Sequence, residues 1–210
     1  MNGASFSLFL LAALIIAAVP GPGIFYVAAR TLSGGRTAGV ASTFGTALGG
    51  LVHIIAGGLG VSAIILASAQ LFTALKLCGA LYLIWLGIRT VMEAGRPLLE
   101  PVGPIGAKRA FREGILVEAL NPKTAAFFLA FIPQFIEPTA GHAALQFMSL
   151  GLISVAFNTF ADVIVVAAAS TASARLARRP QFLQRLRQGS GLFIAGLGIS
   201  LALARRPATS

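Results

Sequence analysis

A chain of 210 residues that is 57% hydrophobic and only 10% charged has too few charges for a soluble domain, in which roughly a quarter of the residues are charged. Its net charge of +10 does not indicate nucleic-acid binding, because that activity needs a solvated basic face and this composition leaves no soluble domain to display one. Several apolar runs exceed the roughly 18 residues needed to cross a bilayer, so we expect an all-α, multi-pass membrane protein.

Six apolar segments predict six transmembrane helices, at about 5–29, 39–66, 71–92, 114–136, 144–170 and 189–204. The first lacks a basic n-region and stays apolar beyond any plausible cleavage site, so we expect a retained span rather than a signal peptide. The spans form one polytopic membrane domain over 1–210, in which the cytoplasmic loop 93–113 separates halves at about 1–92 and 114–206. Halves of three spans insert in opposite orientations, which is the layout of an inverted-repeat transporter.

The distribution of basic residues predicts the orientation in the membrane. Twelve Arg and Lys residues follow the first, third and fifth spans, whereas the opposite side carries Lys76, Arg205 and Arg206. The side richer in Arg and Lys normally faces the cytoplasm. We therefore expect both termini to face away from the cytoplasm.

Two of the predicted spans are interrupted by proline. The first contains Pro20-Gly21-Pro22-Gly23, which removes two backbone donors and adds two flexible positions. The fourth contains Asn121-Pro122-Lys123, and a lysine at the centre of a span costs roughly 2.5–3.5 kcal/mol unless it faces a bundle interior or a water-filled path. We interpret both breaks as parts of a substrate site. The alternatives are a simple kink at Pro20 and a snorkelling Lys123 that pairs with Glu118.

A polar row crosses the fifth predicted span. Ser154, Asn158 and Asp162 recur every four residues and so share one helix face. A carboxylate at this depth is a natural proton carrier, and we interpret Asp162 as the coupling group, with Asn158 beside it on the ion or substrate path. A structural pair between Asp162 and Lys123 is the alternative.

A histidine lies on a glycine row in the second predicted span. His53 alternates at four-residue spacing with Gly45, Gly49 and Gly57, and small residues at that spacing let helices approach closely. A lone histidine on such a face is typically packed and hydrogen-bonded, so His53 is a minor candidate for the ion path. The glycine row could alternatively form the seam of a homo-oligomer.

The sequence has no cluster of metal ligands, no phosphate-binding glycine loop and no Ser/His/Asp arrangement. We therefore expect no metal, no cofactor and no enzymatic activity. A membrane-embedded enzyme acting on lipid remains an alternative, as does a non-transporting assembly subunit. The enzyme would need polar catalytic groups at one interface, where Glu93, Glu100 and Glu113 lie in one loop without a histidine.

Three groups of residues carry a resemblance to a known family. They are Pro20-Gly21-Pro22 in the first span, the run KLCGALYLIWLG at 76–87 in the third, and Phe111-Arg112-Glu113-Gly114 leading to Asn121-Pro122-Lys123 and Pro133-Gln134-Phe135. In these residues the chain resembles the lysine exporter / homoserine–threonine resistance family of bacterial amino-acid efflux proteins, over essentially its whole length.

The resemblance implies a six-span permease of the bacterial inner membrane, with both termini in the periplasm, that exports amino acids or close derivatives by proton antiport. Its expected partners are an amino-acid substrate, protons and the lipid bilayer. We expect the substrate carboxylate to meet the helix end after Gly23 together with Lys123, and the ammonium to meet unwound carbonyls and Asp162.

Overall fold

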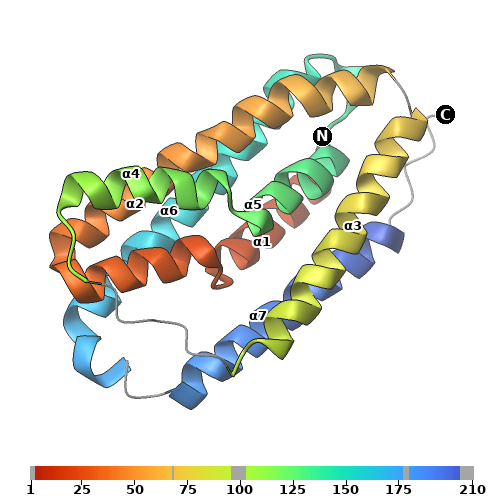
Figure 1. Ribbon diagram of the computed structural model, residues 1–210. Coiled ribbons are helices and arrows are strands. Elements are labelled where there is room, and N and C mark those ends of the chain that lie inside the picture. Colours follow the sequence, from red (N-terminus) through yellow and green to blue (C-terminus); the bar gives the residue numbers. More distant parts are fainter. Residues whose placement is uncertain (1–2, 68, 96–102, 177–179, 204–210) are drawn as a thin grey trace.

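The computed structural model describes residues 3–67, 69–95, 103–176 and 180–203, and every regular element in these ranges is a helix (Figure 1). The elements are α1 (Gly3–Ala18), α2 (Pro22–Ala67), α3 (Ala69–Met92), α4 (Ala107–Ala119), α5 (Pro122–Ala126), the π-helical η1 (Phe127–Phe131), the 3-10 turns η2 (Ile132–Phe135) and η3 (Pro138–Ala140), α6 (Ala143–Leu176) and α7 (Pro180–Leu203).

Length and apolar composition make five helical stretches in these ranges capable of crossing a membrane. They are Pro22–Gly60, Gln70–Met92, Ala107–Phe135, Ala143–Thr171 and Gln184–Leu203, and α1 is a shorter apolar helix. The chain is therefore an all-α, multi-pass membrane protein, as its composition predicts. Some of the charges used to predict its orientation lie outside the described residues: Arg96, Arg178, Arg179, Arg205 and Arg206.

Helix α2 consists of two arms that run in opposite directions. At Gly35 the backbone has φ 74° and ψ −175°, a left-handed conformation that favours glycine. The first arm (22–34) runs toward the left in Figure 1, and the second arm (36–67) returns toward the upper right. Gly35 thus supplies the turn between the first two predicted spans.

The first predicted span is broken where its prolines indicated. Helix α1 ends at Ala18, and the first arm begins at Pro22. Proline suits the first position of a helix, because the N–H group that it lacks would have no partner within the helix. Beyond the break, the first arm continues to the turn at Gly35. The span predicted at 5–29 is therefore two helix segments joined at 19–21.

The fourth predicted span is broken as well, and it begins earlier than predicted. Its first segment, α4, starts at Ala107 rather than 114, because the amphipathic stretch before Gly114 continues the helix. Asn121 caps the next segment by accepting a hydrogen bond from the backbone N–H of Lys123. The remainder is not one helix either, since α5 passes into the π turn η1 and then η2, which contains Pro133.

The long helices pack in antiparallel pairs, and glycines line the contacts. The second arm of α2 lies along α6, where a Cβ added at Gly50 would come within 2.8 Å of Val155. Helices α3 and α7 form a separate pair on the right-hand side of Figure 1, where a Cβ at Gly87 would lie 2.5 Å from the carbonyl oxygen of Gly191. Substituting larger residues there would separate the helices.

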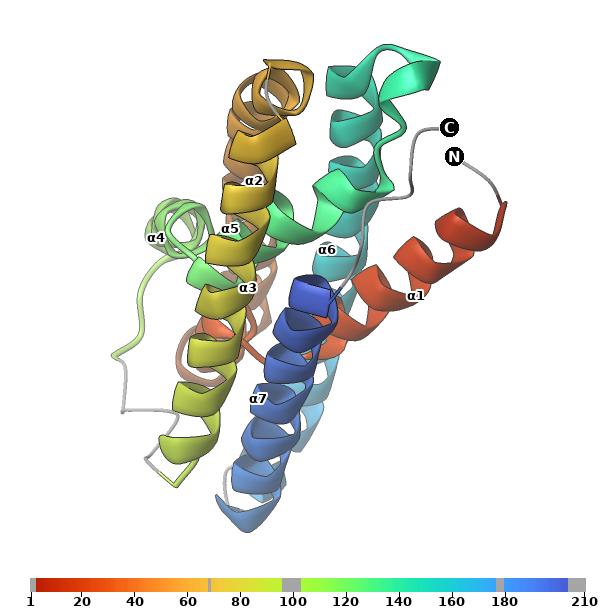
Figure 2. The same ribbon diagram turned by 90° about the vertical axis from the view of Figure 1, so that its right-hand side faces the viewer.

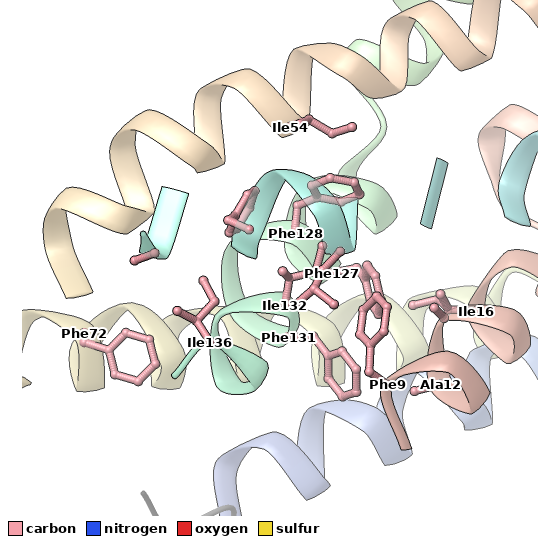
Figure 3. Close-up of a cluster of buried hydrophobic side chains, with 14 residues drawn as sticks. Phe9, Ala12, Ile16, Ile54, Phe72, Phe127, Phe128, Phe131, Ile132 and Ile136 are labelled. Carbon is pink, nitrogen blue, oxygen red and sulfur yellow. The ribbon is translucent and has the colours of Figure 1, made fainter. Parts of the chain in front are cut away.

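An aromatic cluster fixes the segment after the second break against α1 (Figure 3). Phe127 and Phe131 stack with ring centroids 5.1 Å apart, and Phe9 of α1 meets Phe135 edge-on at 5.4 Å. Phe128 in turn meets Phe147 of α6 at 6.1 Å. Such pairs add to the burial of their large apolar surfaces. The cluster thereby holds both broken helices in one position relative to α6.

The two ends of the described chain lie toward the same end of the bundle. Helix α1 begins and α7 ends toward the right-hand side of Figure 1, whereas the turn at Gly35 and the start of α4 lie at the left. Figure 2 shows the same arrangement from the side, with the start of α1 in the upper part and the start of α7 at the bottom.

Candidate functional site

Gly23, just after the first break, and residues of the second break line one small cavity between α2, α4, α5 and α6. Its volume is about 20 Å³, which leaves room for roughly one water molecule. The lining residues are Gly23, Ile24, Thr46, Ala47, Gly50, Glu118, Asn121, Lys123, Val155, Asn158, Thr159 and Asp162. Five candidates from the sequence, Gly23, Asn121, Lys123, Asn158 and Asp162, thus come from three separate segments of the chain to a single site.

Lys123 joins the second break to the first. Its side chain is 5% exposed, and its ammonium donates to the carbonyl oxygens of Ile16 at 3.1 Å and Val19 at 2.9 Å. The last carbonyls of a helix lack partners within the helix and attract positive charge. Lys123 therefore satisfies the end of α1 instead of snorkelling to the surface, and the alternative of a direct pair with Glu118 is wrong.

Pro20, Gly21 and Pro22 form the first break but do not line the cavity themselves. A Cβ added at Gly21 would lie 3.1 Å from Cε of Lys123. The break therefore provides the space in which the lysine side chain crosses to α1. Pro122 has the matching position at the start of α5, where its ring follows the capping Asn121.

Glu118 is a site residue that the sequence indicated only as a partner of Lys123. It is 6% exposed, and its carboxylate accepts hydrogen bonds from Asn121 Nδ2 at 2.8 Å and Thr124 Oγ1 at 2.6 Å. The space for this carboxylate depends on Gly23, since a Cβ there would lie 2.6 Å from Glu118 Oε2. A glutamate one turn before the Asn-Pro break was the available signal.

Asp162 supplies the second buried carboxylate. It is 4% exposed and accepts a hydrogen bond from Thr46 Oγ1 at 2.8 Å. Thr46 was missed, because a threonine in an apolar run gives no sign of a partner 116 residues away. Asn158 lines the same cavity, whereas Ser154 on the same face donates to the Leu150 carbonyl of its own helix.

His53 lies beside the cavity and does not line it. Its Nε2 donates to the carbonyl oxygen of Glu118 at 2.9 Å, and its ring lies 5.7 Å from that of Phe128. His53 is thus packed and hydrogen-bonded, and its part in the ion path stays a prediction.

The glycine row that includes His53 packs against another helix of the same chain. Cβ atoms at Gly45 and Gly49 would meet α4, at 3.1 Å from Gly114 Cα and 2.9 Å from Glu118 Cβ respectively. The hypothesis that this row is an oligomer seam is therefore wrong, because α4 already occupies it.

A charged cluster joins the first arm of α2 to α4 between the cavity and the turn at Gly35. Glu113 accepts from Arg30 at 2.8 Å and from Arg109 at 2.7 Å. The hydroxyl of Tyr26 lies 3.2 Å from Glu113 Oε2 and 2.8 Å from the Ala110 carbonyl oxygen. Glu113 is thus engaged in ion pairs, as is Glu93 with Arg89, while Glu100 lies outside the described residues.

The charges around the cavity do not balance. Glu118 and Asp162 are carboxylates, and Lys123 is the only cationic residue that lines the cavity. With all three ionised, the cavity carries one excess negative charge, which is costly in a membrane interior. One proton or one ammonium group would neutralise it. Within the described ranges no three His, Cys, Asp or Glu side chains group closely enough to hold a metal ion.

Comparison with known proteins places the chain among transporters. The family model of the LysE type translocator matches residues 14–205. The chain is 31% identical to a homoserine/homoserine lactone efflux protein of Salmonella typhimurium over 94% of this chain and 95% of the relative, and 32% identical to an uncharacterized membrane protein of Vibrio cholerae over 94% and 96%. It is 29% identical to a leucine efflux protein of Salmonella choleraesuis over 72% and 74%. No solved structure matches it significantly.

Proposed function

The chain belongs to the LysE type translocator family, and we propose that it is a secondary transporter that exports amino acids or close derivatives across the bacterial inner membrane by proton antiport. The relatives named as homoserine and leucine efflux proteins support the substrate class. The observation that carries the proposal is the meeting of two broken helices, two buried carboxylates and one buried lysine at one cavity.

The helix breaks provide complementary ends for a zwitterion. The first arm and α5 begin at Pro22 and Pro122, so their positive N-terminal ends lie beside the breaks. The substrate carboxylate binds there together with Lys123. The substrate ammonium binds at Asp162 and Glu118, which provide the negative side of the cavity.

Charge balance couples the substrate to the proton. A proton on a carboxylate and the substrate ammonium compete for the same negative side of the cavity, while the substrate carboxylate is held by the helix N-terminal ends and Lys123. A proton that arrives from outside therefore displaces the substrate, and the substrate that arrives from inside displaces the proton. Asp162 is the proton site, because its one side-chain donor is Thr46, whereas Glu118 accepts from two side chains.

The two halves are proposed to be inverted repeats. Each consists of a helix broken before a proline, at Pro22 or Pro122, followed by two long helices. The corresponding helices α2 and α6, and likewise α3 and α7, pack in antiparallel pairs, which supports a pseudo-two-fold axis in the membrane plane. The positions of α1 and α7 support placing both termini on one side, which the basic residues assign to the periplasm.

The site must open during transport. A volume of about 20 Å³ cannot hold an amino acid, so the described conformation is closed around the site. The ion pair between Arg30 and Glu113 holds the first arm against α4 at the predicted cytoplasmic end. Its separation would give the cavity access to the cytoplasm.

The proposal is tested by uptake into inverted membrane vesicles, with a panel of radiolabelled amino acids and with the proton gradient either intact or collapsed by an uncoupler. We expect saturable uptake of neutral amino acids that falls when the gradient is collapsed. Vesicles without the protein provide the background. Uptake equal to this background for the whole panel would contradict the export function, and uptake indifferent to the uncoupler would contradict proton coupling.

A further inference from the structure

A second hollow lies between the second arm of α2 and α6, on the side of the turn at Gly35. Its volume is about 110 Å³, somewhat below the roughly 150 Å³ of an engineered cavity that binds benzene. Two rows at helical spacing form it, one on each helix. We call this hollow the access groove. Its lining includes Arg36, Thr43, Phe44, Thr159, Val163 and Val166.

The access groove and the central cavity share one lining residue. Thr159 lines both, and its hydroxyl donates to the Val155 carbonyl of its own helix at 2.8 Å. On the facing helix, Thr43 lines the groove and Thr46 lines the cavity, one turn apart. Thr46 in turn donates a hydrogen bond to Asp162.

The outer end and the walls of the access groove differ in chemistry. Its outer end carries Arg36, which is exposed and has no ion-pair partner within the described part of the chain. Its walls are apolar and include Phe44, Val163 and Val166. A ligand with one anionic group and a compact apolar group matches this pattern, because guanidinium binds carboxylate in a bidentate manner and the walls accept the apolar part.

We propose that the access groove is the cytoplasmic binding station of the transported amino acid, where Arg36 binds the α-carboxylate and Phe44 contacts an apolar side chain. This inference rests on the proposed export function and adds a substrate class to it: neutral amino acids with an apolar side chain of about leucine size. From the groove, the substrate passes Thr159 to reach Asp162.

Matched variants test the groove by transport kinetics in inverted vesicles. Phe44→Ala should raise KM for leucine by about tenfold, the effect of one or two lost hydrophobic contacts, and change KM for alanine less than twofold. Phe160→Ala is the control, because Phe160 is 61% exposed, as Phe44 is 62% exposed, but lies outside the groove. Arg36→Gln should raise KM for both substrates about tenfold, with Arg36→Lys intermediate and the exposed Arg112→Gln unchanged.

Thiol labelling shows whether water and substrate reach the groove. In a Cys78→Ala background, which removes the single cysteine, Thr159→Cys should react with a membrane-impermeant maleimide from the cytoplasmic face, and saturating leucine should slow the reaction severalfold. The measurement uses monodisperse, purified protein reconstituted with the same face accessible. No labelling would mean that a lipid acyl chain fills the groove, and the inference would be overturned.

The transport measurements distinguish a failure of the groove inference from a failure of the proposed export function. If the wild-type protein transports leucine and the Phe44 and Arg36 variants match their controls, the groove inference is wrong while the export function stands. If the wild-type protein transports no amino acid, the export function itself is wrong.

Discussion

The ammonium of Lys123 lies 2.9 Å from the carbonyl oxygen of Val19, so the cation of the second helix break closes the end of the first. This contact makes one site from two interruptions that are about a hundred residues apart in the chain. It also leaves two carboxylates of the same cavity with a single fixed cation.

Lys123→Met should abolish coupled export, because the cavity would then hold two carboxylates without any fixed cation. The carbonyl oxygen of Val19 would lose its Lys123 donor, and this loss should also lower stability by about 1–3 kcal/mol, the cost of an unsatisfied buried group. Adding Glu118→Gln to Lys123→Met restores the original net charge and should recover measurable export. Export rates and melting temperatures of the two single variants and the double variant give the interaction energy between the two substitutions. Additive losses would contradict the charge-balance account.

Gly23→Ala should strongly reduce export, because the new methyl group would lie 2.6 Å from the Glu118 carboxylate and displace it. Overpacking of this kind costs about 1–3 kcal/mol. Gly60→Ala is the matched control in α2, since nothing lies within 4 Å of a Cβ there. The measurement is leucine uptake at equal amounts of folded protein. Equal export by the two variants would show that Gly23 has no special role at the cavity.

Glu113→Gln should weaken the closed conformation, because it leaves the buried guanidinium of Arg30 without its carboxylate. Arg109→Gln removes a mostly exposed partner of the same carboxylate and should change stability by less than about 1 kcal/mol. Cysteine labelling at Tyr26→Cys, in the Cys78→Ala background, reports opening between the first arm and α4. We expect faster labelling with Glu113→Gln than with Arg109→Gln. The same labelling rate in both would contradict a latch at this ion pair.

The sequence predicted both helix breaks and most residues that meet at them, since prolines, a lysine and an aspartate in apolar runs are visible without a structure. It did not predict the partners of these residues. Thr46 looks like any small residue of a helix interior, and only the packing of α2 on α6 brings it to Asp162. The sequence predicted a carboxylate as the partner of Lys123. Its ammonium instead binds the backbone carbonyl oxygens of Ile16 and Val19, at the end of α1 that the first break creates.

The sixth span begins at Pro180 rather than 189, and the fourth begins at Ala107 rather than 114. Hydropathy places the start of the fourth span at 114, because the charged stretch before that position looks like a loop. In the structure those charges continue α4 and are satisfied by ion pairs such as that of Arg109 with Glu113. The π turn of η1 could not be predicted either, because its aromatic contact with α6, between Phe128 and Phe147, is encoded by no local pattern.

The central claim is that a proton on Asp162 and the substrate ammonium exclude each other from one cavity. The most direct measurement records proton movement with a trapped pH-sensitive dye while purified protein in proteoliposomes transports leucine, with Asp162→Asn compared to the wild type. We predict that the wild type moves protons opposite to leucine and that Asp162→Asn abolishes this proton movement while still exchanging labelled for unlabelled leucine. Proton movement of wild-type size in Asp162→Asn would contradict the account.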